Sequence, residues 1–385
     1  MIAYDREWLG NINIRKDVDD AFDENCMTKE EQEAVHNKYP VGFYTPNIFI
    51  GIGLLLLTIV ILFFSAGLIT LWFRNSSVNM FGALAILFAI ACYIVLEYMI
   101  RVKKHFQSGV DNGLLWIASI TLFCGISFPH DLEGLLNCSI VFVISLFGSI
   151  RYTDRLMATI LFFSFIGMIF YACVEMGSIA KTIAPFIIMI VSFLVYMIVL
   201  RSRSSKGFIH YRNCLIMIEI SSLISLYAAG NYYVVRELSN EMFQLYLKPG
   251  EGIPFGWLFW IFTAIIPFIY LVRGIQKKNV ILIRVALLLV AAIVFTVRYY
   301  HAVLSVETAM TIAGILILAI AYGLMKWLHG PKYGFTYAAV SKKNELDKLN
   351  IESLLISQTF VPGTSPDGTE FGGGDFGGGG TSGEY

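Results

Sequence analysis

The stretch GIGLLLLTIVILFFSAGLITLWF, residues 51–73, carries no charged side chain over its whole length. A helix rises about 1.5 Å per residue, so ~20 apolar residues cross the ~30 Å hydrocarbon core of a bilayer. Similar apolar stretches recur along the chain as far as Trp327. Hydrophobic residues make up 57% of the 385 residues and charged residues only 15%, which is too apolar for an ordinary soluble domain. The sequence therefore predicts a polytopic membrane protein.

About ten stretches fit a transmembrane helix, and they are apolar on both faces. A membrane barrel would instead show segments of ~10 residues that alternate in polarity. Helices satisfy their own backbone groups within lipid, so we expect an all-α transmembrane helical bundle. The expected spans are 47–73, 79–100, 112–128, 134–150, 153–175, 179–200, 213–235, 255–272, 279–297 and 307–328.

Lys and Arg residues concentrate in every second gap between the expected spans. Twelve of them lie in the gaps after the second, fourth, sixth and eighth spans or in the first residues of the span that follows, and five lie in or just beyond the alternate gaps. Cytoplasmic loops of membrane proteins are rich in Lys and Arg. We therefore expect these four loops and both termini to be cytoplasmic, which requires an even number of spans.

The two ends of the chain differ in composition from the apolar centre. The last segment is rich in glycine and acidic residues, contains Phe371, Phe376 and Tyr385, and has no Lys or Arg, so we expect it to be disordered. Its aromatic residues either contact a partner or belong to a tail without a receptor. The expected divisions are an acidic helical hairpin at 1–46, the membrane domain at 47–328, a short helix and linker at 329–360, and the Gly/Phe-rich tail at 361–385.

The N-terminal segment holds ten acidic residues and five basic ones. Ile14, Val18 and Phe22 recur with a spacing of four, which predicts a short amphipathic helix. Thr28 followed by Glu31 predicts a capping box at the start of a second helix. We expect a cytoplasmic hairpin that either packs against its own cytoplasmic loops or docks a partner protein.

Charged residues within the expected spans are few, and each should have a partner or a function because charge is costly in lipid. Glu219 and Arg284 lie at similar expected depths from the basic side, so an ion pair between them is predicted. Glu97 and Arg155 lie nearer the same side and either extend this group or reach out to the lipid headgroups. The group is interpreted as a structural ion-pair network or, alternatively, as a proton-coupled or cation-coupled site.

A second group of polar residues is expected at the opposite, outward-facing side. Tyr and Arg side chains there are typical of a belt at the membrane interface. The alternative is a transferase site, with His as general base and Arg holding a phosphate or carboxylate. The group comprises His130, Asp131, Asn231, Tyr232, Arg236, Arg298, Tyr299 and His301.

Signatures of common cofactor and metal sites do not occur in the sequence. The chain contains no GxxxxGK[ST], HExxH or GxSxG motif, and its six cysteines are scattered without CxxC spacing. The net charge is zero, which gives no indication of a nucleic-acid partner. We expect no cofactor, no metal and no nucleic acid, with membrane lipids as the general surroundings.

Two regions carry a family resemblance. The stretch at 27–64, which includes MTKEEQEAVHNKYP and GIGLLLLTIVILFF, and the stretch at 297–329 resemble uncharacterised bacterial inner-membrane proteins that share a domain of unknown function. The Gly/Phe-rich tail is similar to tails of membrane proteins from the Bacteroidota. The resemblance implies a multi-pass protein of a bacterial inner membrane and implies no activity.

The charged residues are concentrated in the soluble ends of the chain. This distribution favours a non-enzymatic membrane anchor, sensor or scaffold that binds proteins through 1–46 and 341–385. A small-solute or proton-coupled transporter that uses Glu219 is the first alternative. A membrane-embedded acyl- or glycosyl-transferase with an outward-facing His/Arg/Tyr site is the second.

Overall fold

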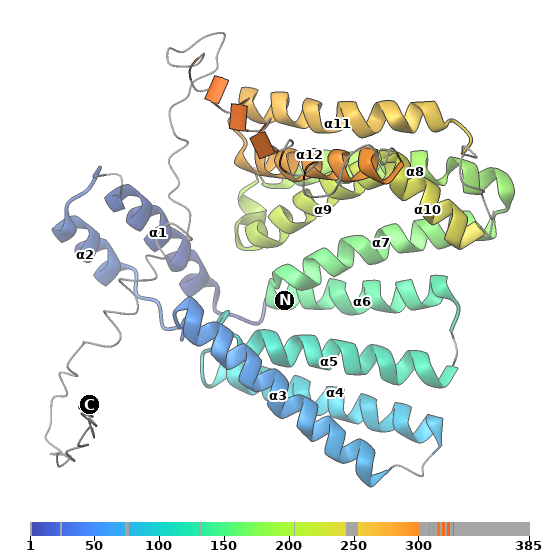
Figure 1. The fold of residues 1–385 in the computed structure, drawn as a ribbon. Helices are drawn as coiled ribbons and strands as arrows, with labels where there is room; N and C mark the ends of the chain where they lie inside the picture. The colour runs from blue at the N-terminus through green and yellow to red at the C-terminus, as the bar shows by residue number, and fades with distance from the viewer. Residues whose placement is uncertain are drawn as a thin grey trace, which may run out of the picture. The chain divides into compact units, whose positions relative to one another are not determined.

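The computed structural model of this chain describes residues 2–23, 25–73, 77–130, 132–203, 205–243 and 253–300, with scattered positions from 308 to 326. In this part of the chain every regular element is helical (Figure 1). The helices are α1 (Arg6–Asp23), α2 (Lys29–Lys38), α3 (Ile48–Trp72), α4 (Val78–Arg101), α5 (Val110–Ser127), η1 (Phe128–His130), α6 (Gly134–Tyr152), α7 (Arg155–Glu175), α8 (Ser178–Arg203), η2 (Lys206–Tyr211), α9 (Arg212–Gly230), α10 (Tyr232–Phe243), α11 (Gly256–Gln276) and α12 (Val280–Tyr300).

Within the described ranges, nine helices are long and apolar enough to cross a membrane, which indicates a multi-pass membrane protein. They correspond to the first nine predicted spans, so the prediction of an all-helical bundle is confirmed for these residues. The predicted tenth span, 307–328, falls largely outside the described residues, as do the linker and the tail. The cytoplasmic position of both termini stays a prediction.

The predicted seventh span, 213–235, is wrong at its C-terminal end. The helix α9 stops at Gly230, and Asn231 takes an extended backbone conformation. The Asn231 side chain then accepts a hydrogen bond from the Val234 backbone N–H at 3.2 Å and so caps the start of α10. Hydropathy runs continuously across this position, so a window of apolar residues does not detect the break.

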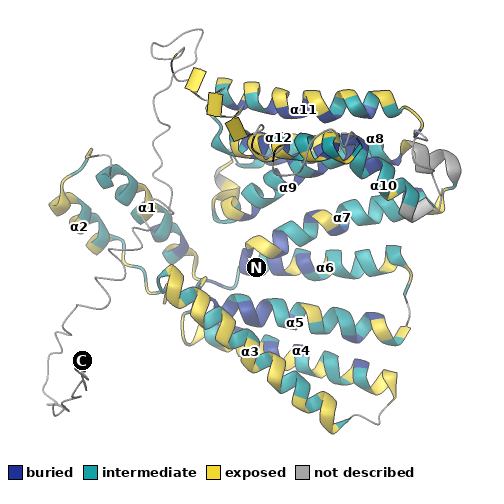
Figure 2. Cartoon of the chain, in the orientation of Figure 1, coloured by how far each residue is buried: buried dark blue, intermediate teal, exposed yellow. Residues whose placement is uncertain are grey.

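The first span, α3, is the least buried of the nine candidate spans in the described residues. It has no buried residue (Figure 2). Its most extensive packing is against α5. Phe63 and Phe64, which are 74% and 68% exposed in the chain alone, belong to its apolar surface. Such a continuous apolar surface is stable only in contact with lipid or another protein.

In contrast to α3, the helix α9 is surrounded by other helices, because it packs against α7, α8, α10, α11 and α12. Its buried side chains include Ser221, Ser222 and Ser225. Small residues allow close approach of neighbouring helices in a membrane, where packing and hydrogen bonds drive association. Ser192 on α8 accordingly donates a hydrogen bond to Ser225 at 3.2 Å.

Glycine permits a similarly close approach between α4 and α5. A Cβ added to Gly82 would lie 2.9 Å from the carbonyl oxygen of Gly125, and one added to Gly125 would lie 2.8 Å from the carbonyl oxygen of Gly82. Either added methyl group would push the two helices apart. The α4–α5 pair therefore depends on the absence of side chains at both positions.

The N-terminal segment contains the two helices α1 and α2, which pack together as a hairpin, and the predicted capping box between Thr28 and Glu31 is complete. Arg15 on α1 closes it by donating to the carbonyl oxygens of His36 and Tyr39 at 2.6 and 2.7 Å. These carbonyls belong to the C-terminal end of α2, where a cation also offsets the helix dipole. Asn11 adds a hydrogen bond to the Pro40 carbonyl at 2.8 Å.

Candidate functional site

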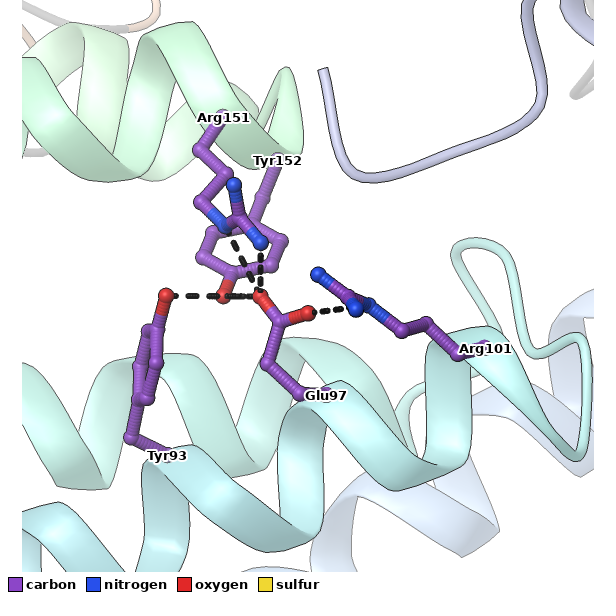
Figure 3. Close-up of polar contacts among 5 residues, drawn as sticks. All are labelled: Tyr93, Glu97, Arg101, Arg151 and Tyr152. Atoms are coloured by element: carbon purple, nitrogen blue, oxygen red, sulfur yellow. Dashed lines mark hydrogen bonds and ion pairs between the residues drawn. The ribbon is translucent and has the colours of Figure 1, made fainter. Parts of the chain in front are cut away.

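The described part of the bundle contains four groups of polar or aromatic residues that are candidate sites. The first is the Glu97 network, formed by Tyr93, Glu97, Arg101, Arg151 and Tyr152 (Figure 3). The Glu97 carboxylate accepts from the Tyr152 hydroxyl at 2.7 Å and from Arg151 Nη2 at 2.6 Å. Its other oxygen pairs with Arg101 Nε at 2.8 Å.

This network joins the C-terminal end of α4 to that of α6. Charge-assisted hydrogen bonds of this length are about twice as strong as neutral ones. One carboxylate oxygen of Glu97 accepts these hydrogen bonds, and the other has the ion pair with Arg101 but no hydrogen bond among the described residues. The group therefore acts as a connector between helices. Arg155, predicted to extend this group, lies in the first turn of α7, whereas Arg101 and Arg151 contact Glu97.

The second group surrounds Glu219 on α9. Its side chain is fully buried, and its carboxylate contacts Arg203 Nη1 of α8 at 2.6 Å. Asn279, in the turn before α12, approaches the other oxygen at 3.5 Å. The guanidinium against Glu219 thus comes from Arg203, whereas the sequence predicted Arg284, which is exposed on α12.

The reason for this difference is the length of α8. The predicted span ended at residue 200, but the helix continues to Arg203, one turn further. Equal depth in the membrane does not fix which way a side chain points around its helix axis, because successive residues rotate by about 100°. Depth alone therefore does not distinguish Arg203 from Arg284.

The third group is a pocket of about 340 Å³ between the N-terminal ends of α3, α5 and α7, here called the three-helix pocket. Gly109, at φ 92°, precedes α5 and lets it approach α3, because a Cβ there would collide with the Gly51 carbonyl. The residues that line the pocket include Tyr4, Ile48, Ile52, Asp111, Asn112, Trp116, Tyr152, Asp154, Arg155 and Leu156.

Asp111 lies in the first turn of α5 and is 3% exposed. Its carboxylate accepts from the backbone N–H groups of Gln107 and Ser108 at 2.8 and 2.9 Å. The hydroxyl of Tyr4, from the N-terminal segment, donates to it at 3.2 Å. Burial and the neighbouring Asp111 raise the pKa of Tyr4 well above its ordinary value, so this hydroxyl keeps its proton. The Nδ1 atom of His105 lies 2.7 Å from the Ser108 hydroxyl.

Asp154 caps α7 and is 6% exposed. One carboxylate oxygen accepts from the Met157 backbone N–H at 2.8 Å and from Trp116 Nε1 at 3.2 Å. The other accepts from Asn112 Nδ2 at 2.9 Å. Burial raises the pKa of Asp154, which lies in the turn between α6 and α7, despite these hydrogen bonds. The hydrogen bonds therefore do not fully offset the cost of burying the ionised Asp154 carboxylate.

Sequence reasoning did not single out Asp111 and Asp154, although both carry a local signal. Ser108 and Asp111 form an S-x-x-D pattern before an apolar run, which is typical of a helix start. Asp154 likewise stands directly before the apolar stretch of α7. These patterns identify caps, but they do not indicate that two caps from distant parts of the chain line one pocket.

The fourth group is the predicted outward-facing cluster, which proves to be mainly aromatic. Tyr232 stacks on Trp260 with ring centroids 4.9 Å apart, and Tyr233 packs edge-on against Tyr299 at 4.7 Å. Such pairs each add about 0.5–1.5 kcal/mol beyond area burial. We call the group Tyr232, Tyr233, Trp260, Tyr299 and Tyr300 the aromatic cluster.

The polar residues predicted for this cluster are partly brought together. Asn231 donates to Thr296 Oγ1 at 3.0 Å, and Arg236 lies over the Tyr300 ring at 5.3 Å. Arg298 lies near the end of α12, and its buried Nη1 atom has no hydrogen-bond partner among the described residues. His130 is exposed on η1, a segment that packs against α4 and α5. Asp131 and His301 fall outside the described residues.

In the described part of the chain, His, Cys, Asp and Glu side chains form no group of three or more that could hold a metal ion. Compared with protein-family models, with curated proteins and with solved structures, the chain matches none. The resemblance of its two ends to bacterial inner-membrane proteins of unknown function therefore stays a prediction.

Proposed function

We propose that this chain is a non-enzymatic membrane docking protein, in which a multi-pass bundle presents the acidic hairpin α1–α2 to a basic surface of a partner protein. The observation that supports this proposal is the attachment of the hairpin to the bundle. A hydrophilic segment that binds no partner has no need of a fixed orientation on the membrane domain. A docking surface gains affinity from one, because less conformational entropy is lost on binding.

The hairpin is attached through both of its ends. The Ala3 N–H donates to the carbonyl of Arg151 at the end of α6, at 2.9 Å. The chain leaving the hairpin forms an isolated bridge with the α4–α5 loop, where the Tyr44 N–H donates to the Lys104 carbonyl at 2.9 Å. Phe43 stacks on Phe106 of the same loop with ring centroids 5.1 Å apart.

The outward surface of the hairpin is polar and acidic. No residue of α2 is buried, and the ten acidic residues of the N-terminal segment outnumber the basic ones by two to one. Anionic lipid attracts basic segments and repels acidic ones. A basic protein surface is therefore a more suitable partner than the membrane itself. The exposed acidic residues are Asp5, Glu7, Asp17, Glu30, Glu31 and Glu33.

The test is a photo-crosslinking residue at the exposed position Asn37, introduced into the full-length protein in native membranes. The captured protein is then purified and its affinity for the docking protein measured. We expect binding that weakens as salt is raised and that falls by roughly tenfold in Asp17→Asn/Glu30→Gln/Glu33→Gln. Glu31 is left intact because it caps α2.

The matched control is Lys29→Gln/Lys38→Gln, which removes exposed charges of the opposite sign from the same helix. We expect its binding to equal or exceed that of the wild type. Capture that survives neutralisation of the acidic residues, or that is lost equally in the control, would contradict electrostatic docking by the hairpin.

A coupled transporter is the second candidate, and the full burial of Glu219 is the observation that favours it. A buried pair that loses one partner is strongly destabilised, by about 3–5 kcal/mol. Glu219→Gln/Arg203→Met removes both charges and avoids that cost. In the docking role this double variant keeps partner binding, whereas a transporter that uses Glu219 loses solute uptake in vesicles even when the protein is folded.

A further inference from the structure

The three-helix pocket contains two buried carboxylates that lack a cationic partner. Among the described residues, no Lys, Arg or His nitrogen forms an ion pair with Asp111 or Asp154. Buried charges in proteins are generally paired. Helix N-termini and hydrogen bonds offset part of the cost here, but burial still raises the pKa of Asp154. The pocket therefore favours a ligand that carries positive charge.

The shape and lining of the pocket favour an ammonium group. Its volume of about 340 Å³ lies within the range of small-molecule sites, ~300–1,000 Å³. Asp154 uses one of its oxygens for a single hydrogen bond, from Asn112, so this oxygen retains capacity for another donor. Trp116 and Tyr152 also line the pocket and offer aromatic rings that attract a cation.

A second charge of the ligand is indicated by Arg155. This residue begins α7, lines the same pocket and is exposed, and no described carboxylate forms an ion pair with it. Arg binds phosphate well, and the N-terminal ends of α3, α5 and α7 all meet at the pocket. A ligand with an ammonium near Asp154 and a phosphate near Arg155 would match both charges.

The walls of the pocket indicate that this ligand has acyl chains. Ile48 and Ile52 on α3 and Leu156 on α7 line it and are 52%, 51% and 41% exposed. These residues belong to the first two turns of predicted spans, a level at which lipid headgroups meet hydrocarbon. Exposed apolar side chains at that level are suited to lipid tails.

We propose that the three-helix pocket binds the headgroup of a zwitterionic phospholipid with a primary amine, of the phosphatidylethanolamine type. The ammonium lies at the Asp154 carboxylate, the phosphate lies at Arg155, and the acyl chains run along Ile48, Ile52 and Leu156. The proposal is independent of protein docking by the hairpin, because it concerns different residues and a different ligand.

The experiment measures the thermal unfolding of the full-length, delipidated protein in detergent. Phosphatidylethanolamine, phosphatidylglycerol or soluble glycerophosphoethanolamine is added in turn. We expect phosphatidylethanolamine to raise Tm in a saturable way and phosphatidylglycerol to have a much smaller effect. Equal stabilisation by the two lipids would overturn the proposal. A full shift with the soluble headgroup alone would also overturn it, because the site would then bind a free amine.

The decisive variant is Asp154→Asn, because Asn caps a helix about as well as Asp and its oxygen keeps the hydrogen bonds from the Met157 N–H and Trp116. Its new amide group faces Asn112, which can turn its own amide oxygen toward it. We expect its lipid-free Tm to stay near that of the wild type and its apparent affinity for phosphatidylethanolamine to fall roughly tenfold. The charge-matched control Glu175→Gln lies at the exposed C-terminal end of α7, outside the pocket and the hairpin, and should bind like the wild type.

Arg155→Gln tests the phosphate contact separately. We expect a similar loss of affinity for phosphatidylethanolamine. Unchanged lipid affinity in Asp154→Asn would overturn the ammonium site, and unchanged affinity in Arg155→Gln would overturn the phosphate site. Native mass spectrometry of co-purified lipid gives the second readout, in which the wild type should retain the amine-bearing lipid and Asp154→Asn should lose it.

Discussion

The hydroxyl of Tyr4 lies 3.2 Å from the carboxylate of Asp111 and donates a hydrogen bond to it. This contact joins a residue at the beginning of the chain to the first turn of α5. Tyr4 also belongs to the same buried cluster as Leu96, Ile100 and Leu114 of the bundle. The N-terminal hairpin is therefore continuous with the core of the membrane domain at this point.

Tyr4→Phe removes only the hydroxyl of this contact. We expect a local loss of about 1 kcal/mol, because the remaining Asp111 hydrogen bonds persist while one donor is lost. Hydrogen–deuterium exchange of the full-length protein should show faster exchange at the start of α1. Tyr44→Phe is the control, since Tyr44 is 46% exposed. Equal acceleration in both variants would contradict a specific role for the Tyr4 hydroxyl.

The Glu97 network offers a comparison between two arginines that pair with the same carboxylate. Arg151 is 23% exposed and Arg101 is 66% exposed. We expect Arg151→Gln to lower the free energy of unfolding by about 1–3 kcal/mol. Arg101→Gln should cost less than about 1 kcal/mol, because solvent screens an exposed pair. Unfolding in mixed detergent measures the free energy of unfolding of both variants. Equal losses of stability would show that the burial of an arginine does not determine how much its ion pair contributes.

The spans were predictable because hydropathy and helix length are local properties of the sequence. The Thr28–Glu31 capping box was predictable for the same reason, since it depends on residues three apart. The break at Asn231 was missed because it depends on a single cap within an apolar stretch. Local patterns therefore identify helices better than they identify the breaks between consecutive helices.

The polar contacts were harder to predict because they depend on how the helices are rotated and paired. The sequence singled out Glu219 by its charge, but predicting its contact with Arg203 required knowing that α8 extends one turn further. The three-helix pocket brings together Tyr4, Asp111 and Asp154, residues separated by up to 150 positions in the chain. No local spacing in the sequence indicates that residues so far apart in the chain lie close together.

The capping box gives a prediction about pH. Hydrogen bonds from the Thr28 backbone N–H and hydroxyl lower the pKa of Glu31 below its ordinary value. The ionised form is thus favoured in the folded state. Its contribution to α2 is present above the unfolded value, ~4.3, and is lost as the pH falls through the lowered pKa.

We therefore expect α2 to lose protection against hydrogen exchange, after correction for intrinsic rates, as the pH of the full-length protein is lowered from 5 to 3. Glu31→Gln removes the titrating group and should show little of this pH dependence. Glu30→Gln, an exposed neighbour, should behave like the wild type. A pH response that persists unchanged in Glu31→Gln would contradict the assignment.

The side of the membrane occupied by the hairpin is testable through a native cysteine. Cys26 is exposed in the turn between α1 and α2, whereas Cys92, Cys173 and Cys214 are buried in the bundle. The distribution of Lys and Arg predicts that the hairpin is cytoplasmic. A membrane-impermeant maleimide should therefore leave Cys26 unlabelled in intact cells and label it after permeabilisation.

The matched control places a thiol on the opposite side of the predicted topology. Met176 is 78% exposed at the end of α7, in a loop predicted to face outward. In Cys26→Ser/Met176→Cys, labelling should occur in intact cells, and Cys26→Ser alone should give only background. Labelling of Cys26 in intact cells, with Met176→Cys protected, would invert the topology and place the acidic hairpin and the three-helix pocket on the outer side.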